Sequence, residues 1–152
     1  MLLDFASLSD CAGEISALGD SLFHGETSLY IEDIINDKTS HRVFAAFRDE
    51  KTAGFLILST VLDEAELLEV AVSENFRRSG IASELMNEIF EWCKKNGIVQ
   101  IFLEVRESNF PARAYYRKFG FSEDGRRKNY YRDPVKDAVL MSGKISFQTF
   151  SI

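Results

Sequence analysis

A basic glycine turn is the first part of the sequence whose residue types could do chemistry. It reads Arg77-Arg78-Ser79-Gly80-Ile81-Ala82 and follows a strand-like apolar segment over residues 66–72. A glycine lets the backbone approach a ligand closely, and the first N–H groups of a helix that starts there have no partner inside the helix. With two arginines beside them, these groups suit a pyrophosphate. The ordinary alternative is a helix start with a solvated basic face, and the spacing alone leaves both open.

A glutamate at the end of the next strand-like segment is the candidate general base. Alternation over residues 100–105 places every second side chain on one face: Gln100, Phe102 and Glu104. Glu104 lies at the carboxyl end, where open α/β sheets bind their ligands. A carboxylate is a weak base for an ammonium, so burial or a relaying water must assist it. Glu66 and Glu69 are rival bases, and an ion pair with Arg106 is the structural alternative for Glu104.

The elements that position these groups form a β-α-β unit. Between the two strand-like segments, apolar residues recur at helical spacing and predict one buried stripe: Ile81, Ala82, Leu85, Met86, Ile89, Phe90 and Cys93. Lys94, Lys95 and Gly97 mark the end of this helix. A turn between an apolar strand and a helix is the context that a phosphate-binding motif requires.

These residues resemble a known family. The turn resembles the Gln/Arg-x-x-Gly-x-Gly/Ala signature of the GCN5-related N-acetyltransferase superfamily. Further segments resemble, within it, the bacterial ribosomal-protein-alanine N-acetyltransferases: Val61-Leu62-Asp63-Glu64-Ala65, Leu103-Glu104-Val105-Arg106, Ser108-Asn109, Tyr116 with Phe119-Gly120-Phe121, and Asn129-Tyr130-Tyr131. The resemblance covers most of the chain from Val43 to Met141, with its motifs in the family's order.

The resemblance implies a fold, a cofactor and a set of site residues. The fold is a single α/β domain over residues 1–152, with a mixed central sheet whose two central parallel strands are splayed to admit a pantetheine arm. The co-substrate is acetyl-CoA, without a metal. By resemblance Glu104 accepts the proton of the amine, and Tyr116 protonates the departing CoA thiolate, although an aromatic in a short helix is usually a core residue. The resemblance assigns the cofactor contacts to Val70, Ala71, Val72, Arg77, Arg78, Ser79, Gly80, Ile81, Ala82, Ser83, Asn109 and Tyr116.

The remaining elements are predicted from periodicity and turn residues. We expect a short strand over 2–5, a helix over 9–23 capped by Ser9 or Asp10, a helix over 29–36 and a hairpin of strands over 42–47 and 52–62. Gly54 and Ser59 mark places where the second of these strands could kink. After the central unit we expect a helix over 109–118 and strands over 121–128 and 135–142, with residues 143–152 left unplaced.

Composition indicates one soluble domain. The chain has 152 residues, 45% hydrophobic and 28% charged, with a net charge of −6 that disfavours a nucleic-acid-binding surface. We find no membrane span and no targeting peptide, and expect a cytoplasmic protein with Cys11 and Cys93 reduced and no metal cluster. Basic residues gather in or beside the expected cofactor segments: Arg77, Arg78, Arg113, Arg117, Lys118, Arg126, Arg127 and Lys128.

The sequence determines the acceptor less well than it determines the fold or the cofactor. The resemblance implies that the acceptor is the N-terminal amine of a protein, in particular of a ribosomal protein starting with Ala or Ser. It also implies that residues 129–131 and the loop after the first helix line the groove that binds this acceptor. That loop commonly carries a Pro-Trp-Ser element in the family, whereas here it reads Phe23-His24-Gly25-Glu26-Thr27-Ser28. Acetylation of a small amine or a lysine, and a non-catalytic acyl-CoA-binding module, stay open as alternatives. Oligomeric state is not indicated.

Overall fold

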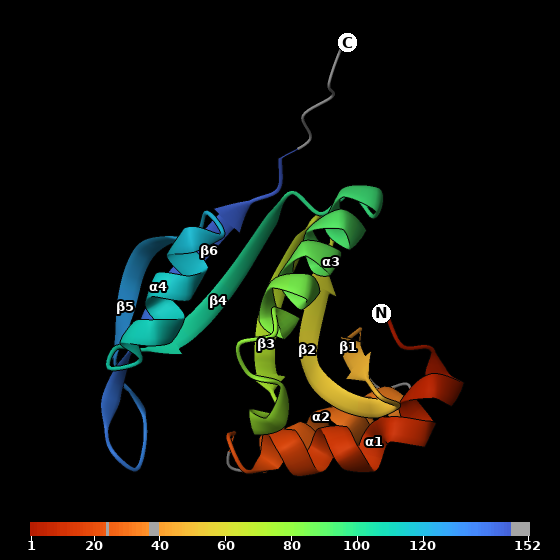
Figure 1. The fold of residues 1–152 in the computed structure, drawn as a ribbon. Coiled ribbons are helices and arrows are strands. Elements are labelled where there is room, and N and C mark those ends of the chain that lie inside the picture. The colour runs from red at the N-terminus through yellow and green to blue at the C-terminus, as the bar shows by residue number, and fades with distance from the viewer. Residues whose placement is uncertain (24, 37–39, 147–152) are drawn as a thin grey trace.

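One six-stranded sheet runs through the computed structural model, which describes residues 1–23, 25–36 and 40–146 (Figure 1). Its strands are β1 (Arg42–Arg48), β2 (Lys51–Val61), β3 (Glu64–Val72), β4 (Gln100–Arg106), β5 (Ser122–Tyr131) and β6 (Lys136–Lys144). They lie in the order β1-β2-β3-β4-β6-β5, with β3 and β4 parallel and the other neighbours antiparallel. The predicted mixed α/β sheet is confirmed.

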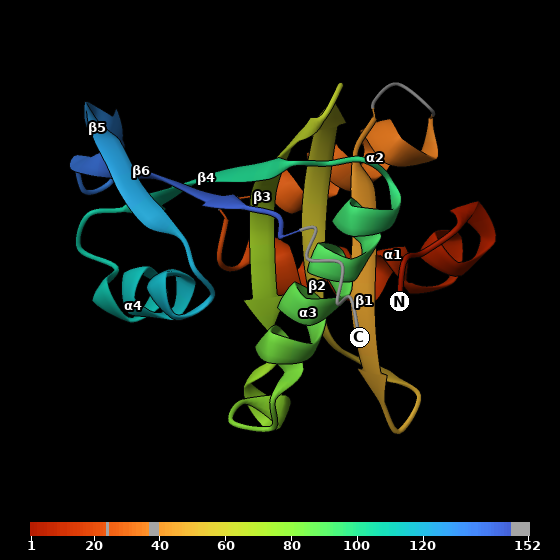
Figure 2. The ribbon, with the colours of Figure 1, turned by 90° about the horizontal axis from the view of Figure 1, so that it is seen from above.

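Four helices cover the two faces of this sheet (Figures 1 and 2). They are α1 (Phe5–Asp20), α2 (Glu26–Ile35), α3 (Ile81–Lys95) and α4 (Phe110–Lys118), and a short 3-10 turn, η1 (Glu74–Phe76), precedes α3. Helices α3 and α4 pack with β2, β3, β4 and β6 in one hydrophobic core, and α1 and α2 pack with β1 and β2 in the other. Each fully buried aliphatic side chain in these cores contributes about 1.5–3 kcal/mol. The predicted stripe of α3 faces the first core, where Leu85, Met86 and Ile89 are fully buried.

Helix α1 begins earlier than the sequence suggested. Asp4 caps it, its Oδ1 accepting a hydrogen bond from the Ser7 N–H at 2.8 Å, so the predicted caps Ser9 and Asp10 lie inside the helix. An aspartate is as good a cap as serine, and starting at Phe5 lets α1 bury Leu8 as well as Ile15. The strand expected over 2–5 is therefore wrong and is reduced to one bridge between Leu2 and Phe44.

Other boundaries also move. Helix α2 starts at Glu26 rather than residue 29, following Gly25 in a left-handed conformation (φ 84°). Strand β5 continues to Tyr131, and β6 takes in Gly143 and Lys144 from the segment that had been left unplaced. His24 of the expected loop and residues 147–152 of the tail lie outside the described residues.

Strands β3 and β4 pair over a short stretch and then part. The parallel ladder runs from Glu64↔Gln100 to Leu67↔Leu103, while β3 continues to Val72 and β4 to Arg106. Beyond Leu67, in the part of the chain that the structure describes, the edge of β3 facing β4 has no strand partner. This is the splayed pair that the family resemblance implied.

A β-bulge sits where the strands part. Ile57 pairs with Glu69 and Leu58 with Leu67, so Leu68 is the extra residue on β3. As a result both Leu68 and Glu69 face α1 and α2, and the alternation of β3 resumes in the opposite phase. The irregularity of β2 thus lies between the two predicted kink positions, Gly54 and Ser59.

Gly54 has a packing role instead. A Cβ at this position would lie 2.8 Å from both the Ala71 carbonyl oxygen and Ile81 Cγ2. Only a glycine allows the start of α3 to approach β2 this closely. The residue therefore helps to set the position of the α3 N-terminus.

Candidate active site

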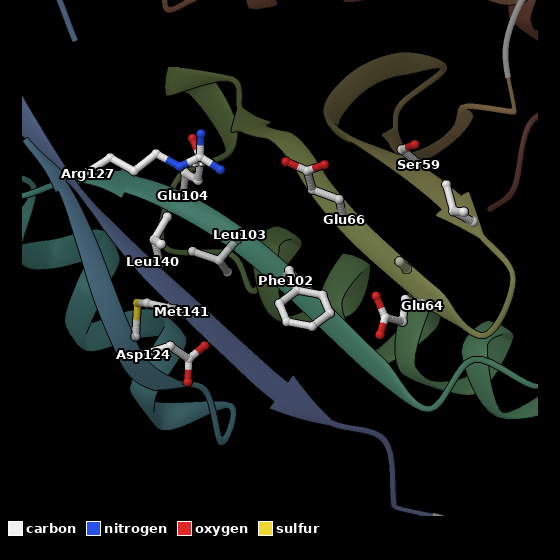
Figure 3. A pocket seen from close by; sticks show the side chains of 12 residues that line it. Ser59, Glu64, Glu66, Phe102, Leu103, Glu104, Asp124, Arg127, Leu140 and Met141 are labelled. Atoms are coloured by element: carbon white, nitrogen blue, oxygen red, sulfur yellow. Dashed lines mark ion pairs between the residues drawn. The ribbon is translucent and has the colours of Figure 1, made fainter. Parts of the chain in front are cut away.

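A pocket lies on the sheet where β2, β3, β4 and β5 present polar side chains and β6 contributes apolar ones. Its volume is about 390 Å³. Its lining, drawn in Figure 3, is Ser59, Val61, Glu64, Ala65, Glu66, Phe102, Leu103, Glu104, Asp124, Arg127, Leu140 and Met141. Phe102 and Glu104 reach it because they point away from α3, whereas Ile101, Leu103 and Val105 are buried toward that helix. The predicted division of β4 into two faces is confirmed.

Glu104 lies in the wall of this pocket, one residue past the last rung that β4 shares with β3. Its side chain is 20% exposed, and its Oε1 lies 3.3 Å from Nε of Arg127 (Figure 3). The Tyr130 hydroxyl also donates a hydrogen bond to Glu104, and this bond, followed by the charge of Glu104, raises the pKa of Tyr130. The carboxylate is thus half enclosed and held by two partners from β5.

Glu66 faces Glu104 across the pocket, from β3 (Figure 3). Partial burial, and then the negative charge of Glu104, raise the pKa of Glu66, while Arg127 lowers it. One pocket thus contains the carboxylates of Glu66 and Glu104 and the guanidinium of Arg127. The structure therefore brings together the candidate base and one of its rivals.

Glu69, the other rival, lies elsewhere. The bulge directs it under α2, where it is 2% exposed and its Oε1 accepts a hydrogen bond from the Thr27 hydroxyl at 2.6 Å. Burial raises the pKa of Glu69 to about 7, against the lowering effect of Thr27. It does not line the pocket, and its position is that of a buried structural carboxyl.

Tyr116 is 7% exposed and packs edge-on against Tyr115 and Phe121. Burial raises its pKa, with smaller contributions from Tyr115 and Tyr131, so the phenol stays protonated. Tyr131 in turn has its pKa raised to about 12 by burial and by Glu104. Tyr116 therefore lies outside the pocket lining and is linked to Glu104 through Tyr131.

The predicted phosphate turn has the expected geometry. Gly80 has φ 79° and no atom within 4 Å of where a Cβ would lie, and it precedes the first turn of α3. The Ser79 hydroxyl donates to the Phe76 carbonyl, which ties the turn to η1. Arg77 and Arg78 are exposed, and Arg78 adopts φ 62°. Free N–H groups, an open approach and two cations fit a pyrophosphate.

The other predicted cofactor residues flank the divergence of the strands. Val70, Ala71 and Val72 occupy the stretch of β3 beyond its last rung with β4. Ser83 is in the first turn of α3 and contacts the Tyr115 hydroxyl of α4. Asn109 caps α4, its Oδ1 accepting from the Ala112 N–H at 3.2 Å, so it has a structural role as well.

Half of the basic residues that we placed in or beside the cofactor segments, four of eight, form ion pairs instead. Arg113 and Arg117 both contact Glu123, and Arg126 contacts Glu107 at 2.8 Å. Together with Arg127 on Glu104, these pairs hold α4 and β5 in place. The exposed arginines of the turn, Arg77 and Arg78, have no ion pair among the described residues and are available to an anionic ligand.

The sequence did not indicate that Arg127 lines the pocket and pairs with Glu104. In β5 the register shifts between Arg127 and Tyr131, and Asn129 has φ 53°. Such an irregularity changes the direction of the side chains beside it, and a single sequence carries no clear pattern that predicts it. Among the described residues, no group of three His, Cys, Asp or Glu side chains could hold a metal ion, and no helix has the length and apolarity to cross a membrane.

Comparison with known proteins identifies the fold and its relatives. A model of the acetyltransferase (GNAT) family matches residues 14–121. The ribosomal protein bS18-alanine N-acetyltransferase of Escherichia coli K12 is 38% identical over 105 residues, which are 68% of this chain and 71% of that protein.

Two solved structures extend the comparison. The crystal structure of the ribosomal-protein-S18-alanine N-acetyltransferase from Escherichia coli superposes with a TM-score of 0.70 at 32% identity, covering 80% of this chain and 81% of that one. Ard1 from Thermoplasma volcanium superposes with a TM-score of 0.77 at 27% identity, covering 96% of both chains.

Proposed function

The chain belongs to the acetyltransferase (GNAT) family, which uses acetyl-CoA, and from this premise we propose that it acetylates the N-terminal α-amine of a ribosomal protein that begins with Ala or Ser. The observation that carries the proposal is the position of Glu104. Its carboxylate lines an open pocket one residue beyond the point where β3 and β4 part, on the strand that follows the phosphate turn and α3. The name of the Escherichia coli relative supports the choice of acceptor.

We assign the cofactor to residues of the turn and of the parted strands. The N–H groups at the start of α3, with Arg77 and Arg78, would bind the pyrophosphate. The free edge of β3 at Val70, Ala71 and Val72 would hydrogen-bond the pantetheine arm as an added strand does. Acetyl-CoA supplies the thioester, and the protein's part is to hold it with its carbonyl toward Glu104.

Glu104 then acts as the general base for the amine. An α-ammonium must lose a proton before its nitrogen can attack, and a half-enclosed carboxylate beside the reacting atoms can accept it directly or through water. The attack is direct, in a ternary complex, and forms the amide N–C bond while the thioester C–S bond breaks. The thiolate leaves with the electron pair of the broken bond.

Tyr116 stabilises the leaving thiolate by a hydrogen bond. Because its pKa is raised by burial, it is a poor donor of a whole proton to a free thiolate, but its hydroxyl is present in the protonated form at neutral pH. A fixed O–H dipole in a dry site stabilises developing negative charge. We therefore assign it this electrostatic role, and the thiolate takes its proton from solvent as it leaves the site.

The first experiment is acetyl transfer to a panel of amines, followed as thiol release. We expect turnover with Ala- and Ser-starting peptides and none when the same peptides carry a blocked α-amine. Turnover confined to small amines, or to lysine side chains, would refute the acceptor while keeping the chemistry. Tight binding of CoA with no turnover on any amine would favour the non-catalytic module.

Two variants separate the candidate bases. Glu104→Gln keeps shape and hydrogen-bonding capacity but cannot accept a proton, so we expect turnover to fall about 100- to 10,000-fold with CoA affinity retained. Glu66→Gln, from the opposite wall of the same pocket, should lose much less. A larger loss in Glu66→Gln than in Glu104→Gln would reverse the assignment.

A further inference from the structure

A cation already occupies the proposed general base. Arg127 is the only Lys or Arg among the described residues that line the pocket, and it shares this pocket with the carboxylates of Glu64, Glu66, Glu104 and Asp124. Of these it is paired with Glu104, Nε to Oε1 at 3.3 Å. The positive charge thus lies where the ammonium of an acceptor would have to arrive.

The ion pair between Arg127 and Glu104 is weak enough for a competing cation to break it. Nε of Arg127 lies 3.3 Å from Glu104, a longer separation than in the other pairs of β5, and the Arg127 side chain is 58% exposed. Arg113, by contrast, is 10% exposed and directs two nitrogens onto Glu123, at 3.2 and 2.6 Å. Exposed pairs with a single contact are weak, whereas enclosed pairs with two bonds are structural.

Other groups near Arg127 can bind its guanidinium after it leaves Glu104. Its guanidinium carbon lies 5.6 Å from the centre of the Tyr130 ring, so the ring can hold the cation as it swings. Glu66 and Asp124 line the same pocket and offer a carboxylate to a guanidinium that has left Glu104 (Figure 3). The charge of Arg127 already acts on Glu66 in the structure.

A guanidinium on the base competes with the acceptor. It keeps its proton at all physiological pH values, so it cannot take part in the proton transfer. The Tyr130 hydroxyl donates to the same carboxylate. An incoming ammonium must therefore replace either Tyr130 or Arg127 on Glu104. The exposed, singly bonded Arg127 is the one that yields.

We propose that Arg127 is a positioning residue that holds the acceptor's place on Glu104 and is displaced toward Glu66 and Asp124 by the incoming ammonium. The inference rests on the proposed function, since it takes Glu104 as the base. It restricts acceptors to amines that arrive as cations, because a neutral hydroxyl cannot replace a guanidinium on a carboxylate. It also makes acceptor affinity lower than the pocket's carboxylates alone would give.

The kinetic test compares Arg127→Gln with a matched variant, Arg126→Gln. Arg126 neighbours Arg127 on β5, is 43% exposed and pairs with Glu107 outside the pocket. We expect Arg127→Gln to lower KM for the acceptor about two- to fivefold, the range of an exposed ion pair, with kcat changed less. Arg127→Lys, which restores the charge, and Arg126→Gln should keep the wild-type KM. A KM that rises or does not change in Arg127→Gln would overturn the proposal.

A second measurement needs no turnover. In the complex with CoA, the Nε–H signals of the arginines are followed by NMR while alaninamide, a minimal N-terminal alanine, is added. We expect the Arg127 signal to move and the Arg126 signal to stay. Binding of alaninamide that leaves the Arg127 signal unmoved would refute the displacement. Displacement of Arg127 by alaninamide with no acetylation of any peptide would refute the proposed acceptor and support the placeholder role.

Discussion

Replacing Glu69 by glutamine should make the protein more stable, and increasingly so as the pH rises. Glu69 is 2% exposed, and its one hydrogen bond in the described structure comes from Thr27. The charged groups that face it are Glu26 from α2 and Asp20 from α1, both acidic, and both raise its pKa further. Its other carboxylate oxygen is buried without a hydrogen-bond partner. Ionising this group therefore destabilises the fold.

The magnitude follows from the pKa of Glu69 in the folded and unfolded chain. The folded protein holds this proton up to about pH 7, whereas the unfolded chain releases it near 4.5. Between these values the native state binds more protons than the unfolded state, so the free energy of unfolding falls as the pH rises. At 1.36 kcal/mol for each pKa unit, the loss is about 3 kcal/mol, complete above pH 7.

The assay is urea unfolding of the wild type and Glu69→Gln at pH 5 and pH 8. The amide keeps the size of the side chain and an acceptor for Thr27 but cannot ionise. We expect the variant's advantage in unfolding free energy to grow by about 2.5 kcal/mol from the lower to the higher pH, because part of the loss is already present at pH 5. Glu66→Gln, on the same strand but exposed, is the control and should show a much smaller change. Equal pH dependence in the wild type and Glu69→Gln would refute the reasoning.

Two further predictions concern packing and chemistry. Gly54→Ala should cost about 1–3 kcal/mol in urea unfolding, because its Cβ would lie 2.8 Å from the Ala71 carbonyl and from Ile81 Cγ2. Gly125→Ala, with no atom within 4 Å, is the matched control, and equal stability of the two variants would contradict the packing role. Tyr116→Phe should slow thiol release about 100-fold, because the variant lacks one hydrogen-bond donor to a developing charge. Its unfolding midpoint should not change. An unchanged rate would mean that another group stabilises the thiolate.

The central unit could be predicted from sequence because its signals are local. The stripe of α3, the glycine turn before it and the alternation of β4 each depend on neighbouring residues, and the structure reproduces all three. The start of α1 was misplaced because Asp4, Ser9 and Asp10 are all good caps, and burial of Leu8 decided between them.

The contacts that tune the site are long-range and could not be predicted. Thr27 meets Glu69 across 42 residues, and it does so only because α2 starts early and β3 carries a bulge. Arg127 reaches Glu104 because β5 loses register next to it. Neither irregularity has a residue signature, since both arise from the match between strand lengths and the elements around them.

The parting of β3 and β4 has a consequence for how such a protein can change over evolutionary time. The free edge at Val70, Ala71 and Val72 presents peptide groups, which every substitution except proline leaves in place. The pocket around Glu104 is made of side chains, and each of these can be exchanged singly. Under the proposed function, the pantetheine arm of the donor is recognised by backbone groups, whereas the acceptor is recognised by side chains. A lineage built on this frame can acquire new acceptors by point mutation while its use of one donor is inherited intact.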